Sequence, residues 1–89
     1  MEIVEVDWAE GVREKIITKH RLDPEEVEDS FFERGVRFER GRSGRYLLWS
    51  QSPAGAYILA VFEYEKGRAT VITARIMSEA ERRRFREGR

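Results

Sequence analysis

Arg75 is the strongest candidate for chemistry in this sequence, because it lies near the end of a run of β-branched and small residues, 71–76. A guanidinium is always charged and can hold a phosphate through two parallel hydrogen bonds. At the end of a rigid strand, Arg75 could stabilise the charge that builds up on a reacting phosphate. The alternative is a structural ion pair with an acid of the following segment, such as Glu81.

Three further residues could move a proton or assist beside a phosphate. His20 is the only histidine, and its ordinary pKa lies near neutrality, so it could act as a general base or satisfy carbonyl groups at a helix end. Lys19 could contact a phosphate or complement a helix dipole. Glu81 could act as an acid or base, orient Arg75, or only cap a helix.

Charge is distributed unevenly along the chain, although the formal net charge is zero. Residues 1–33 hold 11 acids and 4 bases, whereas residues 34–89 hold 13 bases and 6 acids. A basic half hints at nucleic-acid binding, and a solvated charged surface is the alternative. The side chains that could contact phosphates or stack on a base are Arg42, Arg45, Arg82, Arg83 and Trp8.

The composition limits the kinds of protein and site that the chain can form. Its 89 residues predict one domain, 1–89, with a modest core. Without cysteine there is no disulfide framework and no thiolate metal site, and one histidine argues against a histidine cluster. We expect no metal and no cofactor. Because no apolar run has the length of a membrane span, we expect a cytoplasmic protein that is not inserted in a membrane.

Local patterns predict the order strand, two helices, four strands, helix. The first strand covers residues 3–8, and the first helix covers about 9–20. Asp23 and Pro24 start the second helix, which runs to about Phe32, and Glu26 completes its capping pattern. Antiparallel strands follow at 36–40, 45–51, 57–65 and 71–76, and the strand at 57–65, apolar on both faces, is the central one.

The end of the chain predicts a strand that runs directly into a basic helix. Strict alternation divides the strand into two faces, with Val71, Thr73 and Arg75 on one and Ile72, Ala74 and Ile76 on the other. Ser78 and Glu81 form a capping box for the helix. The predicted fold class is therefore α+β, a small antiparallel sheet with an N-terminal helical hairpin on one face and a short C-terminal helix.

Several motifs carry a resemblance to a known family. The segment 73–85 reads Thr-Ala-Arg-Ile-Met-Ser-Glu-Ala-Glu-Arg-Arg-Arg-Phe. It is preceded, in order, by Asp7-Trp8, Lys19-His20, Pro24-Glu25-Glu26-Val27 and Gly44-Arg45-Tyr46-Leu47. Together these motifs resemble the BrnT toxins, small ribonucleases of the RelE/ParE-like toxin superfamily, over nearly the whole chain.

The resemblance implies a fold and a function. It implies a metal-independent endoribonuclease that is the toxin of a bacterial type II toxin–antitoxin pair and inhibits translation by cleaving RNA. Arg75 would stabilise the phosphate, with Lys19, His20, Arg45 and Glu81 as helpers. The implied partner is a protein antitoxin, usually of the ribbon-helix-helix DNA-binding type, in a toxin–antitoxin heterotetramer or with a toxin dimer.

Two positions depart from the family's usual pattern. Many BrnT-like sequences carry an arginine after the glycine that precedes the central strand, and this chain has Ala56 there. Many also have a tyrosine where this chain has Phe85, which cannot transfer a proton. The departures favour the alternative that the chain is a catalytically inactive RelE-like module that binds RNA or a protein.

Overall fold

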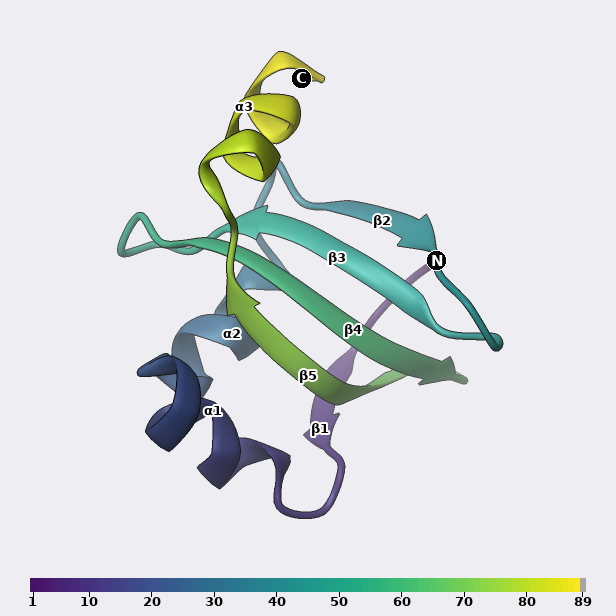
Figure 1. Ribbon diagram of the computed structural model, residues 1–89. Coiled ribbons are helices and arrows are strands. Elements are labelled where there is room, and N and C mark those ends of the chain that lie inside the picture. Colours follow the sequence, from purple (N-terminus) through teal and green to yellow (C-terminus); the bar gives the residue numbers. More distant parts are fainter. Residues whose placement is uncertain (89) are drawn as a thin grey trace.

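A computed structural model describes residues 1–88, so Arg89, the last residue of the predicted domain, lies outside the described residues. It confirms the predicted order strand, two helices, four strands, helix (Figure 1). The elements are β1 (Glu5–Trp8), α1 (Val12–His20), α2 (Pro24–Ser30), β2 (Arg37–Arg40), β3 (Tyr46–Gln51), β4 (Tyr57–Glu65), β5 (Arg68–Ile76) and α3 (Glu79–Glu87). None of the helices within residues 1–88 is long and apolar enough to cross a membrane.

The five strands form one sheet in the order β1-β5-β4-β3-β2. Strands β2 to β5 are the predicted antiparallel meander, and β4 is central as expected. The turn between β4 and β5 has positive φ at both Lys66 and Gly67, as a two-residue hairpin requires. The predicted α+β class is confirmed, but β1 pairs parallel to β5, with Trp8 opposite Val71, so the complete sheet is mixed.

Helices α1 and α2 cover one face of the sheet and enclose the main core. Phe62 lies at its centre with no exposed surface, and its ring contacts Phe31 at 5.1 Å, Phe38 at 5.7 Å and Tyr46 at 5.8 Å between centroids. Such aromatic pairs contribute about 0.5–1.5 kcal/mol each beyond the area that they bury. The remaining buried members of this cluster are Ile16, Leu22, Val27, Leu48, Ile58, Ala60, Ala69, Val71 and Ala74.

A β-bulge in β5 overturns the predicted alternation of its side chains. Phe62 pairs with Val71 and Val61 pairs with Thr73, so Ile72 is an extra residue without a partner on β4. Val71 and Ala74 therefore both face the main core, although strict alternation had placed them on opposite faces. The bulge also directs Arg75 away from the core side that Val71 occupies, which is a common use of bulges near functional sites.

The start of α2 matches its sequence signals only in part. The Asp23 side chain accepts a hydrogen bond from the backbone N–H of Glu25, and Pro24 occupies the first helical position, as predicted. Glu26 does not complete a capping pattern, because its Oε1 accepts a hydrogen bond from Ser52 Oγ at 2.6 Å. The helix ends at Ser30 instead of Phe32. Tertiary contact with the loop after β3 has replaced the local interaction.

The last helix packs against the opposite face of the sheet. Ser78 and Glu81 form the predicted capping box at its start. Its one buried side chain, Phe85, contacts a second and smaller cluster with Leu59 and Met77. Figure 1 shows α3 at the top of the view, separated by the sheet from α1 and α2.

Candidate active site and nucleic-acid interface

We call the sheet face that α3 contacts the α3 face, and two rows of its side chains run across β2, β3, β4 and β5. Directly paired residues of neighbouring strands project on the same side. The first row is Arg37, Trp49, Leu59 and Arg75, and the second is Glu39, Leu47, Val61 and Thr73. Because neighbouring strands lie about 4.8 Å apart, the backbones of Arg37 and Arg75 are about 14 Å apart across the first row.

Arg75 is held by the carboxylate of Glu81 in a two-pronged ion pair. Nη1 lies 2.7 Å from Oε1 and Nη2 lies 2.8 Å from Oε2. The Ser78 N–H also donates to Glu81 Oε1 at 2.8 Å, so the carboxylate is fixed from two directions. The Arg75 side chain remains 45% exposed. The ion pair that was the structural alternative for Arg75 therefore forms, and it leaves the guanidinium accessible from solution.

This ion pair shifts the pKa values of both partners. The hydrogen bond from Arg75 and the backbone hydrogen bond from Ser78 lower the pKa of Glu81 to about 2. The same hydrogen bond to Glu81 raises the pKa of Arg75. A general base works best when its pKa lies near the working pH. At neutral pH Glu81 is thus a weak base, and its geometry suits orienting Arg75.

Contacts at both ends hold α3 on the sheet. Near the start of α3, Glu81 forms the ion pair with Arg75. Near the end of α3, Arg37 Nη2 donates a hydrogen bond to the Phe85 carbonyl at 3.0 Å. A cation at this position also complements the helix dipole. A Cβ at Gly88 would overlap the Arg37 guanidinium, so a larger residue there would displace this flexible side chain from its present position.

The three consecutive arginines of α3, Arg82, Arg83 and Arg84, point in different directions, as their spacing predicts. Arg82 lies over the ring of Tyr57 at 4.5 Å, and Arg84 lies over the ring of Trp49 at 5.7 Å. Arg83 points elsewhere and pairs with Glu79 at 3.8 Å. Arg82 and Arg84 therefore bring positive charge over aromatic rings of the α3 face, next to the row that contains Arg75.

The hairpin arginines lie farther along the molecule. Arg45 pairs with Glu63 on the α3 face at 3.3 Å, and both side chains are exposed. Arg42 is exposed in the turn between β2 and β3, and among residues 1–88 it has no ion pair. Both arginines are accessible to a polyanion, but neither contacts Arg75.

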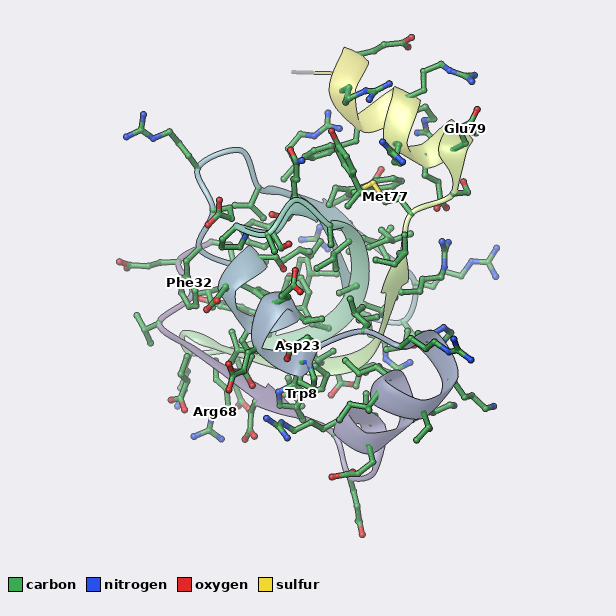
Figure 2. All side chains as sticks on the ribbon, turned by 90° about the vertical axis from the view of Figure 1, so that its left-hand side faces the viewer. Trp8, Asp23, Phe32, Arg68, Met77 and Glu79 are labelled. Carbon is green, nitrogen blue, oxygen red and sulfur yellow. The ribbon has the colours of Figure 1, made fainter. Side chains whose placement is uncertain are left out.

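The structure does not bring the remaining predicted residues together with Arg75. Lys19 and His20 end α1, which covers the opposite face of the sheet. Trp8 packs against the main core, and its Nε1–H donates to Glu28 Oε2 at 2.7 Å. Figure 2 shows Trp8 far from Met77 and Glu79. The sequence alone cannot show that these residues lie on the other side of the sheet from Arg75, because their position depends on how α1 packs against the sheet.

Sequence reasoning missed three residues of the α3 face: Arg37, Glu39 and Tyr57. Tyr57 is half-buried on this face, two residues before Leu59. Arg37 and Glu39 alternate with core-facing Phe38, so correct pairing of β2 with β3 would have placed them here. No metal-ligand cluster of three or more histidine, cysteine or acidic side chains occurs within the described chain.

Acidic and basic residues, which are unevenly distributed along the sequence, are also unevenly distributed between the two sides of the sheet. Acidic residues concentrate on α2, where Glu25, Glu26, Glu28 and Asp29 occupy one short helix. The arginines concentrate on α3 and the sheet face beneath it. The two helices lie on opposite sides of the sheet (Figure 1). This separation favours an anionic ligand on the α3 face.

The architecture is that of a small α+β protein with a helical hairpin on one sheet face and an arginine-rich C-terminal helix on the other. The chain is similar to the 1.1 Å crystal structure of the Brucella abortus ribonuclease toxin BrnT. The TM-score is 0.66 at 22% identity, over 89% of this chain and 99% of that chain. No protein-family model and no curated protein matches the chain. The predicted BrnT-like resemblance is thus confirmed as one of fold.

Proposed function

We propose that this chain is a metal-independent endoribonuclease, the toxin of a type II toxin–antitoxin pair, that inhibits translation by cleaving RNA. The observation that carries the proposal is the Arg75–Glu81 pair on an arginine-rich sheet face. The guanidinium is fixed by two short hydrogen bonds and is still 45% exposed. The fold it shares with a ribonuclease toxin gives independent support.

The chemistry assigned to Arg75 is stabilisation of the phosphate in the transition state. Attack by a 2′-hydroxyl, whose proton passes to solvent water, makes the phosphorus five-coordinate and adds negative charge to its oxygens, which a preorganised guanidinium stabilises. Glu81 fixes the plane of that guanidinium and acts as a positioning residue. Phosphate oxygens can take over hydrogen bonds of Arg75 because the pair is open to solvent.

Tyr57 is the side chain to which we assign proton delivery to the leaving 5′-oxygen. It lies two residues from Leu59, the direct partner of Arg75, so Tyr57 and Arg75 are diagonal neighbours about 7–8 Å apart on one face. Its ring is 6.2 Å from that of Phe85 and beneath Arg82. A phenol can therefore serve this region although Phe85 has no hydroxyl.

Arg45, Arg42 and Arg82 are proposed to contact phosphates on either side of the cleaved bond. Each contact releases counterions, so RNA binding should weaken as salt rises. Lys19, His20 and Trp8 receive no role in cleavage here, because α1 and the main core hold them on the other side of the sheet.

The proposed partner is a protein antitoxin, of the ribbon-helix-helix type that the resemblance implies. Its acidic segment would cover the α3 face, because the exposed arginines of this face attract negative charge. A partner bound there would block RNA access to Arg75. The complex would form in the bacterial cytoplasm as a heterotetramer, or around a toxin dimer.

The test is induced expression of wild type, Arg75→Ala and Arg68→Ala, with growth and RNA integrity measured in the same cultures. Arg68 is a matched control, because it is an exposed arginine of β5 that pairs with Glu5 at 3.6 Å. Growth arrest with fragmented RNA is expected for wild type and Arg68→Ala only. Intact RNA with soluble folded wild type would favour the alternative function.

That alternative is a RelE-like module that binds RNA or a protein without cleaving. Two observations favour it. Phe85 is buried and brings no hydroxyl to the α3 face, and Ala56 brings no charge to the start of β4. Purified protein that binds RNA tightly but leaves it uncut at all protein concentrations would identify this function.

A further inference from the structure

A shallow pocket beside α3 has the composition of a subsite for an unstacked RNA base. Its volume is about 110 Å³, and its lining consists of Arg37, Glu39, Trp49, Arg84 and Phe85. Within residues 1–88, neither Glu39 nor Arg84 belongs to an ion pair. The Nε of Arg37 is buried and has no hydrogen-bond partner. Charged groups without charged partners around an aromatic ring are available to a polar ligand.

Glu39 and Trp49 form an oriented unit at the centre of this pocket. They are diagonal neighbours on β2 and β3, and the indole Nε1–H donates to Glu39 Oε1 at 2.9 Å. No group of the described chain donates a hydrogen bond to the other oxygen, Oε2. Because an ionised carboxylate is an acceptor only, the unit offers a ring face beside a fixed acceptor.

Arg84 covers the Trp49 ring loosely. Its guanidinium carbon is 5.7 Å from the ring centroid, compared with 4.5 Å for Arg82 over Tyr57. A base between the two planes needs about 7 Å, which is two van der Waals separations. Arg84 would move outward by little more than an ångström to admit one. Bases of single-stranded RNA commonly stack on aromatic rings and on arginine planes in this way.

We propose that this pocket binds a guanine base of the RNA substrate, an inference that rests on the function proposed above. Guanine presents two adjacent donors, N1–H and N2–H, which match the two oxygens of the Glu39 carboxylate. Adenine and cytosine present one amino donor beside an acceptor, and uracil presents one N–H between two acceptors. The ring stacks on Trp49, Arg84 closes over it, and Glu39 determines the preference for guanine.

The distance to Arg75 suits a base next to the cleaved phosphate. Trp49 and Arg75 belong to the same row with Leu59 between them, so their backbones lie about 10 Å apart. The side chains of both residues project from the same face. A short stretch of one RNA strand can therefore place a base on Trp49 and a phosphate on Arg75.

The experiment measures binding of short 2′-O-methyl RNA strands, which cannot be cleaved by attack of a 2′-hydroxyl. One strand carries a single guanine among adenines, and the other carries inosine there, which lacks the N2 amino group. Fluorescence anisotropy is expected to show that wild type binds the guanine strand about tenfold tighter. Glu39→Gln should reduce the ratio below twofold. Glu65→Gln removes the same charge from an exposed position of β4 and should keep the full preference.

Equal binding of the two strands by wild type, or no binding of either strand, would overturn the guanine subsite. A preference that persists in Glu39→Gln would also overturn it. Cleavage of unmodified RNA is a separate measurement on the same proteins. A guanine preference without cleavage would support the subsite and reject the proposed function. Cleavage without a guanine preference would support the proposed function and reject the subsite.

Discussion

The two faces of the sheet are both covered by helices, but different forces hold those helices in place. Under α1 and α2, Ile16, Val27 and Phe31 are at most 3% exposed and pack around Phe62. Under α3, Phe85 is the one buried side chain that the helix contributes. The other contacts of α3 are an ion pair, a hydrogen bond at its end, and arginines over aromatic rings.

This difference indicates that the two faces of the sheet have different roles. Opening the first face would expose a close-packed core, which costs several kcal/mol. The α3 face instead keeps its charged groups part-exposed, where an anionic ligand can exchange with internal partners. We infer that the first face supplies stability and the second supplies chemistry.

Neighbouring residues of β4 provide the largest contrast, because Phe62 faces the main core and Val61 faces α3's side of the sheet. Phe62→Ala should lower the free energy of unfolding by about 3–5 kcal/mol. Val61→Ala removes a half-buried side chain and should cost less than about 1.5 kcal/mol. Urea unfolding of both variants measures this. Equal losses would mean that the faces do not differ in their contribution to stability.

Tyr57→Phe should lower the rate of RNA cleavage about a hundredfold, because it removes the proposed proton donor. The hydroxyl is all that changes, so the unfolding free energy should stay within about 1 kcal/mol of wild type. Tyr64→Phe is the matched control, since its hydroxyl donates to the Glu2 carbonyl away from the α3 face. Identical rates for the two variants would remove Tyr57 from the mechanism.

Glu81→Gln should lower cleavage about tenfold, since the guanidinium of Arg75 would lose its ionic anchor and part of its orientation. Single-turnover rates at saturating protein measure this loss. A structural role alone would change stability and leave the rate of the bound substrate unaltered.

The same substitution should alter the acid stability of the protein. The pKa of Glu81 is lowered to about 2 from an ordinary value of 4.5. A lowered folded-state pKa stabilises the fold above the ordinary value, and that contribution is lost as the pH falls from 4.5 toward 2. Wild type should therefore lose stability more steeply than Glu81→Gln in this range, with parallel curves near neutrality. The measurement is thermal unfolding of both proteins at a series of pH values. If wild type and Glu81→Gln lost stability equally between pH 4.5 and 2, the result would contradict the ion pair.

Arg83→Ala should have the smallest effect. Its partner Glu79 is 91% exposed, and exposed pairs of this kind contribute at most about 0.5 kcal/mol. Because Arg83 points away from the rings under α3, RNA affinity should also stay within about twofold, whereas Arg84→Ala should reduce affinity by removing the cation that lies over Trp49. An equal loss for the two variants would show that α3 binds RNA with more than one side.

Local signals in the sequence predicted the elements and the end of the chain well. The capping box of Ser78 and Glu81 and the pair of Arg75 with Glu81 both depend on residues close in sequence. Interactions of this range are encoded in spacing, because helix and turn geometry fix which neighbours meet.

What the sequence could not predict depends on distant partners. The extra residue Ile72 is a β-branched residue like its neighbours, so composition does not mark the bulge that reverses the faces of β5. The contact of Glu39 with Trp49 requires the pairing of β2 with β3. His20 and Lys19 were grouped with Arg75 by residue type, but the packing of α1 places them across the sheet.

The measurement that tests the central claim most directly is cleavage of a single-stranded RNA by purified wild type, Arg75→Ala and Arg68→Ala. Both variants remove an exposed, ion-paired arginine from β5. Loss of transition-state stabilisation by Arg75 should slow cleavage by about 10²–10³-fold, whereas Arg68→Ala should cleave within about twofold of wild type. Cleavage by folded Arg75→Ala at the wild-type rate would contradict the assignment of the α3 face as the active site.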